Sequence, residues 1–500
     1  MSGWKKLSAA SAGGFNDPFW IYQYSNQNNA QGTSTYQAQN AFQLASGSTI
    51  MAFHIRPNSG QTSGDEFPLP IIDVNGSIVG STMPYFYYSP TYSMFLGALT
   101  VVSDPDEVWL TGFTQAPASA LMLARLDYSD ETSVSLDSVK EIYTTNSTDY
   151  FGTYIGQNNN FVHIGSDYYV SGRSYDSSNG FYYTALAKFN SSDVNQWSYQ
   201  YKAAVSDGSN GNQFISCTTD GTNVYTLFNG YNNSTFTVTK INSSGTVVWS
   251  NRYSNPYGDP KYHGIAYNPV SGDIVVALQD KQYWHGGNAY ALFVTSISTS
   301  NGNVSWGKVW GNSATQQWYA NVGENVYVTS SGNIVVQCSG SSGTVSNSKP
   351  SGANGPGPVF TVVLDGSNGS LVRIVCLMTS DSNPTASLES DGGRLTLNDN
   401  MIRTITYDKA SSTYGKRWLA AQFPLDGSIT SGSYTMTELS NEVMYLFEMV
   451  AADYDDDTWS VSGTAQTPTA TSKAVTVDTA TSSYSVATFT NNDDAIVAIT

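Results

Sequence analysis

Short apolar strands, each preceded by a polar turn, recur along this chain at an even spacing. The recurring segments are ASGSTIMAFHI, DPDEVWLTGFT, GSDYYVSGRSY, DGTNVYTLFNG, SGDIVVALQD, SGNIVVQCSG and SDGGRLTLND. Their first core positions, which we call anchors, are Ile50, Val108, Tyr168, Val224, Ile274, Ile334 and Leu395. Successive anchors lie 58, 60, 56, 50, 60 and 61 residues apart, and the average is about 57. Such a period predicts seven repeated units.

Each unit contains further strands of the same kind. After the anchor strand comes a second apolar strand, then an Asx or Gly turn and a third strand that often carries Trp, as in Phe236 to Trp249 and Leu292 to Trp306. A fourth strand precedes the anchor. Alternating strands joined by Gly, Asn and Asp turns are typical of antiparallel hairpins. The sequence therefore predicts an all-β fold, a seven-bladed β-propeller. Stacked β-sandwiches are the rival fold, but they do not need one motif repeated seven times.

The flanks of the repeat region predict the domain organisation. Residues 1–17 are rich in small residues and form a predicted N-terminal arm, with Trp4 as its anchor for assembly with other subunits. The propeller is assigned to residues 18–440, and residues 441–500 are assigned to a closing strand and a small C-terminal β appendage. Either FWIYQYS (Phe19 to Ser25) or VMYLFEMV could supply the strand that closes the ring.

The charge balance excludes two classes of partner. The formal net charge is -18 and the sequence pI is about 4.4, so the surface repels phosphate backbones and anionic lipids. No basic patch offsets this repulsion, and we expect neither nucleic-acid binding nor membrane insertion. The first residues, MSGWKKLSAASAGG, lack the apolar core of a signal peptide, so we expect no secretion.

Few residues point to catalysis or to a cofactor. The chain has no G-x-S-x-G, H-E-x-x-H, Walker or strand-linked G-x-G-x-x-G motif. Four histidines are too few for most metal clusters, and His163, inside FVHIG, is predicted to be a satisfied core residue. The three cysteines are odd in number and far apart, which argues against disulfides and zinc. We predict a non-enzymatic protein without cofactors.

Two carboxylate patterns leave room for other chemistry. Asp453, Asp455 and Asp457, with Asp456 between them, could present oxygens to calcium, but a solvated acidic turn explains the run better because no EF-hand Gly or Glu follows it. Carboxylate pairs for glycoside hydrolysis must lie within about 5 to 10 Å of each other, and the sequence does not place them. A depolymerase activity stays open on this ground.

Aromatic loops are the predicted binding surface. The loops after the anchor strands should share one rim of the propeller, where Tyr175, Tyr231, Tyr283, Trp284 and His285 would offer flat apolar faces beside hydrogen-bonding groups. Sugars stack on such rings, and protein partners also use them. Packing of the rings on neighbouring loops is the alternative.

The N-terminal residues carry a family resemblance. SGWKKLSAASAGG resembles the start of structural virion proteins of marine tailed phages, and units such as SGNIVVQCSG are similar to propeller repeats of phage tail and bacterial surface proteins. The resemblance implies a tail or tail-fibre component that is assembled in host cytoplasm and located in the virion. Its implied partners are other virion subunits in an oligomeric assembly, and a host-surface glycan would be a second partner.

Two other classes share parts of the pattern. SSGTVVW and STSNGNVSW are similar to the tryptophan-docking units of quinoprotein dehydrogenases, but those proteins carry signal peptides and cofactor-clamping residues that have no match here. A bacterial surface lectin would also need a secretion signal. We therefore expect a non-enzymatic virion protein, with a propeller enzyme or a lectin as the alternatives.

Overall fold

The structure is a computed structural model, and it describes the chain except for certain segments. The segments outside the description are 1–2, 7, 10–19, 26–37, 45, 54–65, 74–78, 80–81, 89–93, 102–106, 115–119, 131–132, 145–149, 152–159, 177–180, 203–213, 230–234, 255–259, 281–290, 312–317, 320–325, 341–344, 356, 381–386, 397, 409–415, 428–430, 437–441, 452–454, 459–462, 466, 468, 473–474, 480–483, 491–496 and 499–500.

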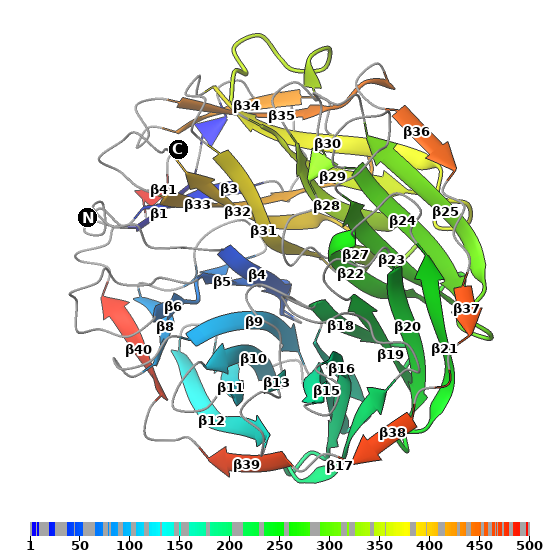
Figure 1. The fold of residues 1–500 in the computed structure, drawn as a ribbon. Helices are drawn as coiled ribbons and strands as arrows, with labels where there is room; N and C mark the ends of the chain where they lie inside the picture. The colour runs from blue at the N-terminus through cyan, green and yellow to red at the C-terminus, as the bar shows by residue number, and fades with distance from the viewer. Residues whose placement is uncertain are drawn as a thin grey trace.

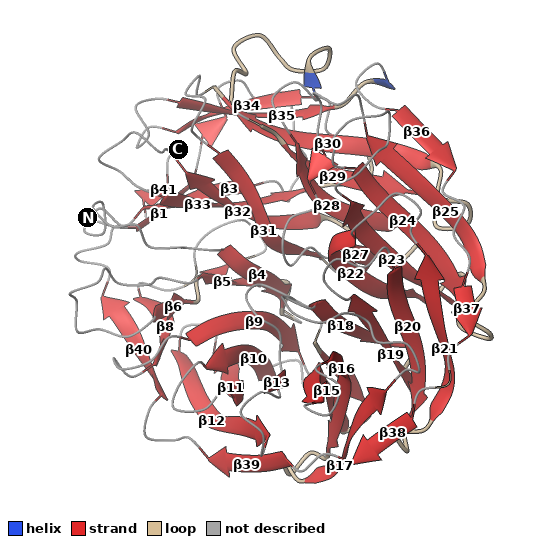
Figure 2. Cartoon of the chain, viewed as in Figure 1, coloured by secondary structure: helices blue, strands red, loops and turns tan. Residues whose placement is uncertain are grey.

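The protein is all-β and consists of several mainly antiparallel sheets. Strands dominate the described residues, which contain no α-helix (Figure 2). Strands that follow one another in the chain are usually neighbours in the same sheet, as expected for hairpins with tight turns (Figure 1). None of the described residues form a helix that is long and apolar enough to cross a membrane.

The sheets follow the order of the chain. Two small sheets contain β4 (Ala38–Gln43), β5 (Thr49–Phe53) and β7 (Ile71–Ile72), and β6 (Glu66–Pro68) with β8 (Thr82–Tyr88). Next come β9 (Met94–Val101), β10 (Glu107–Thr114), β11 (Ala120–Asp130) and β12 (Ser133–Thr144). The following sheet has β13 (Tyr150–Phe151), β14 (Phe161–Ile164), β15 (Asp167–Asp176), β16 (Phe181–Phe189) and β17 (Asn195–Lys202).

The second half of the chain continues the series. One sheet has β18 (Phe214–Thr219), β19 (Asn223–Asn229), β20 (Thr235–Asn242) and β21 (Val247–Ser254). Another has β22 (Pro260–Asn268), β23 (Asp273–Asp280), β24 (Ala291–Ser298) and β25 (Val304–Gly311). A third has β26 (Trp318–Tyr319), β27 (Val326–Val328), β28 (Ile334–Gly340), β29 (Val359–Leu364) and β30 (Leu371–Thr379), extended by β35 (Glu442–Glu448), β34 (Ser431–Met436) and β2 (Ser8–Ala9).

The sheet of the last repeat is completed by N-terminal strands. It contains β31 (Ser387–Leu395), β32 (Met401–Asp408) and β33 (Lys416–Phe423), to which β3 (Trp20–Ser25) and β1 (Gly3–Lys6) are added. Of the two predicted closing segments, Phe19 to Ser25 is the one that supplies a strand to this sheet, because β3 pairs with β33. The other segment forms β35 and pairs with β30.

Most anchors occupy one position in their sheets. Each of these is the second residue of the strand that follows the first hairpin turn: Ile50, Val108, Tyr168, Val224 and Ile274. Ile334 is the first residue of β28. The shared position explains the even spacing in the sequence, because each unit repeats the same hairpin.

Leu395 does not occupy this position, and this anchor was wrong. It is the last residue of β31, the first strand of its sheet, and the second strand begins at Met401. Between the two strands, the Thr396 N–H donates to the Asn400 carbonyl at 2.8 Å. The glycines of SDGG lie inside β31, next to a register shift between Ser390 and Gly392. A β-bulge absorbs glycines that the sequence pattern assigns to a turn.

The sheets pack face to face through apolar side chains of both faces. In β23, Val275 and Ala277 pack toward the sheet of β27–β30, whereas Ile274, Val276 and Leu278 pack toward the sheet of β18–β21. Alternate residues of a strand point to opposite faces, so a strand between two sheets is apolar throughout. Equivalent clusters join each consecutive pair of sheets from β9–β12 to β31–β33. In addition, β31 contacts β4, and β4 contacts β9.

A repeated polar contact, which we call the tryptophan clamp, reinforces this packing. A Trp near the start of β17, β21 or β25 donates its indole N–H to a hairpin carbonyl of the next sheet. The donors and acceptors are Trp197 to Ser243 at 3.2 Å, Trp249 to Thr299 at 2.9 Å, and Trp306 to Gly366 at 3.2 Å. Because the same contact recurs at three junctions, neighbouring sheets are related to one another in the same way.

Candidate functional site

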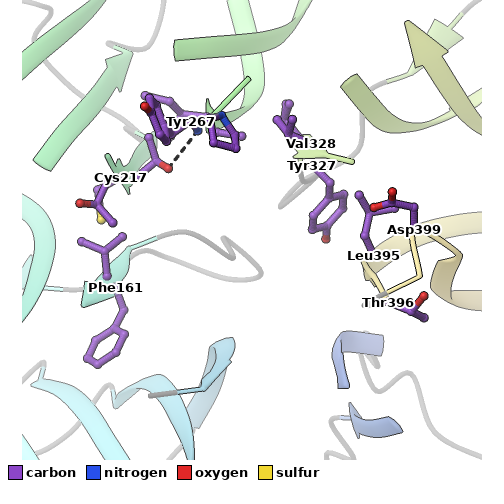
Figure 3. Close-up of a pocket in the computed structure, with 15 residues that line it drawn as sticks. Phe161, Cys217, Tyr267, Tyr327, Val328, Leu395, Thr396 and Asp399 are labelled. Atoms are coloured by element: carbon purple, nitrogen blue, oxygen red, sulfur yellow. Dashed lines mark hydrogen bonds between the residues drawn. The ribbon is translucent and has the colours of Figure 1, made fainter. Parts of the chain in front are cut away.

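A cavity among the described residues lies between the first strands of consecutive sheets. Its volume is about 470 Å³. Most lining residues come from β14, β18, β22 and β27, and the others come from the end of β31 and from the segments that follow β22 and β31. Figure 3 shows them around an open centre, with Cys217 and Phe161 on one side and Leu395, Thr396 and Asp399 on the other. The cavity is therefore built by several repeats together rather than by one loop.

Hydroxyl groups of the lining are already used to fix the backbone. The Thr218 hydroxyl oxygen accepts the Tyr267 N–H at 3.2 Å and so joins β18 to β22 (Figure 3). The Thr219 hydroxyl donates to the Asn223 carbonyl at 2.8 Å and holds the hairpin turn. The Thr396 hydroxyl oxygen accepts the Asn400 N–H at 3.0 Å in the turn after β31. These groups explain the local fold without a ligand.

Asp399 is the one carboxylate among the residues that line the cavity. Its two oxygens accept the Ser330 N–H at 2.9 and 3.0 Å, and one of them accepts the Ser330 hydroxyl at 2.5 Å. Asp399 has a φ of 59°, a left-handed conformation that Asp tolerates in turns. Its carboxylate therefore links two neighbouring hairpins. A pair of carboxylates for acid and base catalysis is not assembled in this lining.

The cavity thiol has little nucleophilic character. Burial raises the pKa of Cys217 to about 12. A thiol reacts as the thiolate, so this group is inert at neutral pH. None of the three cysteines forms a disulfide, and all three are buried. Among the described residues there is no group of three or more His, Cys, Asp or Glu side chains that could hold a metal ion.

The predicted aromatic rim falls almost wholly outside the described residues. Tyr231, Tyr283, Trp284 and His285 lie there. Tyr175 belongs to β15 and is paired with Tyr182 of β16, and the structure does not describe its side chain. The rim therefore stays a prediction.

The predicted assembly and metal residues can be placed only through their strands. Trp4 lies in β1, where it is paired with Tyr24 of β3, so this part of the arm belongs to one of the chain's own sheets. Asp455 and Asp457 lie in β36 (Asp455–Thr458) and are paired with Gly311 and Val309 of β25. Asp453 lies outside the described residues. The acidic run is thus largely a strand at a sheet edge, not a turn.

His163 packs against aromatic rings. Its ring centroid lies 4.8 Å from that of Phe161 and 5.8 Å from that of Trp109. Neither ring nitrogen has a hydrogen-bond partner among the described residues. The sequence predicted a core histidine whose hydrogen bonds are satisfied, and no such bond is found there. Burial, with a further contribution from the positive charge of Arg125, lowers the pKa of His163 to about 4. The ring is therefore neutral at physiological pH.

A second candidate site lies on the outer edges of the sheets. Strands of the C-terminal segment, which we call the strap (residues 455–498), add one by one to these edges instead of pairing with one another. The pairs are β36 on β25, β37 (Gly463–Ala465) on β21, β38 (Thr469–Ser472) on β17, β39 (Val475–Thr479) on β12, β40 (Tyr484–Thr490) on β8, and β41 (Val497–Ala498) on β1. The strap visits the sheets in the reverse of their chain order.

Figure 1 shows this arrangement directly. The orange and red strands β36, β37, β38 and β39 lie along the outer margin, next to green and cyan strands from far earlier in the sequence. The sequence predicted a small C-terminal β appendage in this part of the chain but did not identify the partners of its strands. The long last strand of each repeat could have indicated the pairing, because without a partner its backbone N–H and C=O groups would be left unpaired at a sheet edge.

No protein family model matches the chain, and no curated protein is significantly similar to it in sequence. The functional interpretation therefore rests on the residues and contacts of this chain.

Proposed function

We propose that this chain is a non-enzymatic structural protein of a tailed-phage virion. In this proposal it is a seven-bladed β-propeller whose outer edges are closed by its own C-terminal strap. The partners would be other virion subunits in an oligomeric assembly. The N-terminal resemblance suggests the virion, and the strap is the observation that carries the structural role.

The propeller is supported by the relations between the sheets. Consecutive sheets share apolar clusters, and the tryptophan clamp recurs at three junctions. The contacts of β31 with β4 and of β4 with β9 connect the last repeat to the first two. Radial repetition of four-stranded units accounts for all of these contacts.

The strap supports a structural role because it protects sheet edges. An uncovered edge strand can pair with another chain, and proteins packed at high density must prevent this. Here β12, β17, β21 and β25 are each covered by a short strand of the same chain. The strap also connects each of these sheets to the next, so the sheets cannot separate unless it detaches. Slow unfolding of this kind suits a particle that persists outside cells.

The cavity gives no comparable support to an enzyme. The hydroxyls and the carboxylate described above hydrogen-bond within the chain, and the cavity thiol has a raised pKa. A quinoprotein-like dehydrogenase, a glycan depolymerase and a surface lectin remain alternatives, and no contact described here favours them. Attachment to a host glycan through the aromatic rim is an additional proposal that rests on the sequence.

Two experiments test the proposal separately. Electron-microscopy class averages of the purified protein should show a ring of seven blades, and another number of blades or an open stack would contradict the architecture. Antibodies against the protein should label the tails of phage particles from marine virus concentrates. Labelling confined to cell envelopes would contradict the virion assignment. Release of reducing ends from a polysaccharide panel would favour a depolymerase instead.

A further inference from the structure

Four of the strap strands cover only part of the outer edge on which they lie. On β21, which has 8 residues, β37 contributes 3, and on β12, which has 12 residues, β39 contributes 5. A strap strand of 4 residues covers each of the 8-residue strands β17 and β25. Each of these four strap strands is therefore held by only a few ladder hydrogen bonds, whereas β40 pairs with all seven residues of β8.

The strand β37 is recognised mainly through its backbone. Its residues Gly463, Thr464 and Ala465 are exposed and pair with Tyr253, Arg252 and Asn251. A Cβ atom on Gly463 would lie 2.8 Å from the Tyr253 ring, so the glycine allows the strap to approach this ring closely. Recognition by the backbone does not depend on which molecule provides the strand.

The residues just before the strap are fixed to the sheet of β28–β30 and to the segment that follows β28. The Met449 N–H donates to the Ile374 carbonyl at 3.0 Å, and the Val450 N–H donates to the Ser348 hydroxyl at 2.8 Å. Met449 belongs to an apolar cluster, whereas Val450 is 46% exposed. The chain is thus packed up to this point, and the strands beyond it lie on the outside of sheets that have their own cores.

We propose that the outer edges of one copy of this protein also accept the strap of a second copy, so that exchanged straps link the copies. The closed and exchanged forms make the same strand pairs, so the local concentration of neighbouring copies decides between them. A tethered segment has an effective concentration in the millimolar range, which a crowded assembly can match. This inference identifies one of the proposed partner subunits as a second copy of the same chain. It does not depend on the virion assignment.

Cysteine pairing between two full-length chains tests the exchange. Arg252 of β21 and Thr464 of β37 face each other, and directly opposed residues lie within the range of a disulfide. One chain carries Arg252→Cys, the other carries Thr464→Cys and a different affinity tag, and the two are co-expressed and concentrated to about 1 mM. Oxidation should give a cross-linked heterodimer. The native cysteines are buried and should not interfere.

Two controls define the outcome. A single chain with both substitutions should close the disulfide within a monomer, which checks the register. The mismatched pair Arg252→Cys and Ser472→Cys should give about tenfold less heterodimer, because Ser472 faces Tyr199 on another sheet and only opposed residues come within disulfide range. The pair Lys308→Cys and Thr458→Cys repeats the test on β25.

The proposal is overturned if the double-substituted monomer closes its disulfide while the two-chain experiment yields no heterodimer. Equal cross-linking by the matched and mismatched pairs would also overturn it, as would failure of the monomer to close. None of these results bears on whether antibodies label phage tails, so the two proposals can fail independently.

Discussion

The tryptophan clamp can be tested by adding one methyl group at a glycine. Gly302 lies in the turn between β24 and β25 and has a φ of 73°. Its carbonyl oxygen accepts the Tyr253 hydroxyl at 2.6 Å and the Asn251 side-chain amide at 3.0 Å. A Cβ atom here would collide with the Asn251 amide nitrogen and lie 3.0 Å from the ring of Trp249. Gly302→Ala should therefore push the two sheets apart.

Gly272 of the same sheet provides a matched control. It has nearly the same backbone conformation, with a φ of 74°, but a Cβ atom on it would meet nothing within 4 Å. Both alanine variants incur the cost of a left-handed conformation, about 1 to 2 kcal/mol. Only Gly302→Ala adds overpacking, about 1 to 3 kcal/mol, and weakens hydrogen bonds worth about 1 kcal/mol each. We expect it to be less stable than Gly272→Ala by about 2 kcal/mol or more.

Urea denaturation, monitored by tryptophan fluorescence, measures this difference in the free energy of unfolding. Both variants should keep the far-ultraviolet spectrum of the parent protein. Equal destabilisation by the two substitutions would refute a close contact between the two sheets beside Trp249.

Three further predictions concern single groups. Because the pKa of His163 is about 4 in the folded protein and about 6.5 in the unfolded chain, the unfolded chain takes up the proton first, and stability falls below pH 6.5. Between pH 7.5 and pH 5 the free energy of unfolding should fall by about 2 kcal/mol from this cause, and the fall should be absent from His163→Phe. NMR should find one imidazole that titrates near pH 4. A thiol reagent should not modify the three cysteines of the native protein, Cys217, Cys338 and Cys376, but should modify all of them in denaturant. Fast modification of the native protein would contradict their burial. Tyr253→Phe removes the hydroxyl that donates to the Gly302 carbonyl beside the clamp, and it should cost about 1 kcal/mol in urea denaturation. An unchanged stability would contradict this bond.

The sequence determined the fold class and the unit of repetition. Polar turns before short apolar strands predicted antiparallel hairpins, and five anchors lie at the same strand position because the local turn chemistry repeats. The failure at Leu395 has a local cause, since the Gly pair of SDGG suits a β-bulge as well as a turn, and only pairing with β32 decides between them.

Only the tertiary structure decided what the strap and the tryptophans do. The alternation of residues 475–479 predicts a strand, but backbone hydrogen bonds carry no record of their partner, so the pairing of β39 with β12 could not be read from the sequence. Likewise, Trp249 stands in its repeat as an apolar residue, and its bond to Thr299 exists only because the next sheet brings that carbonyl within 2.9 Å. Local patterns specify turns and faces, whereas contacts between distant segments arise from packing of the whole chain.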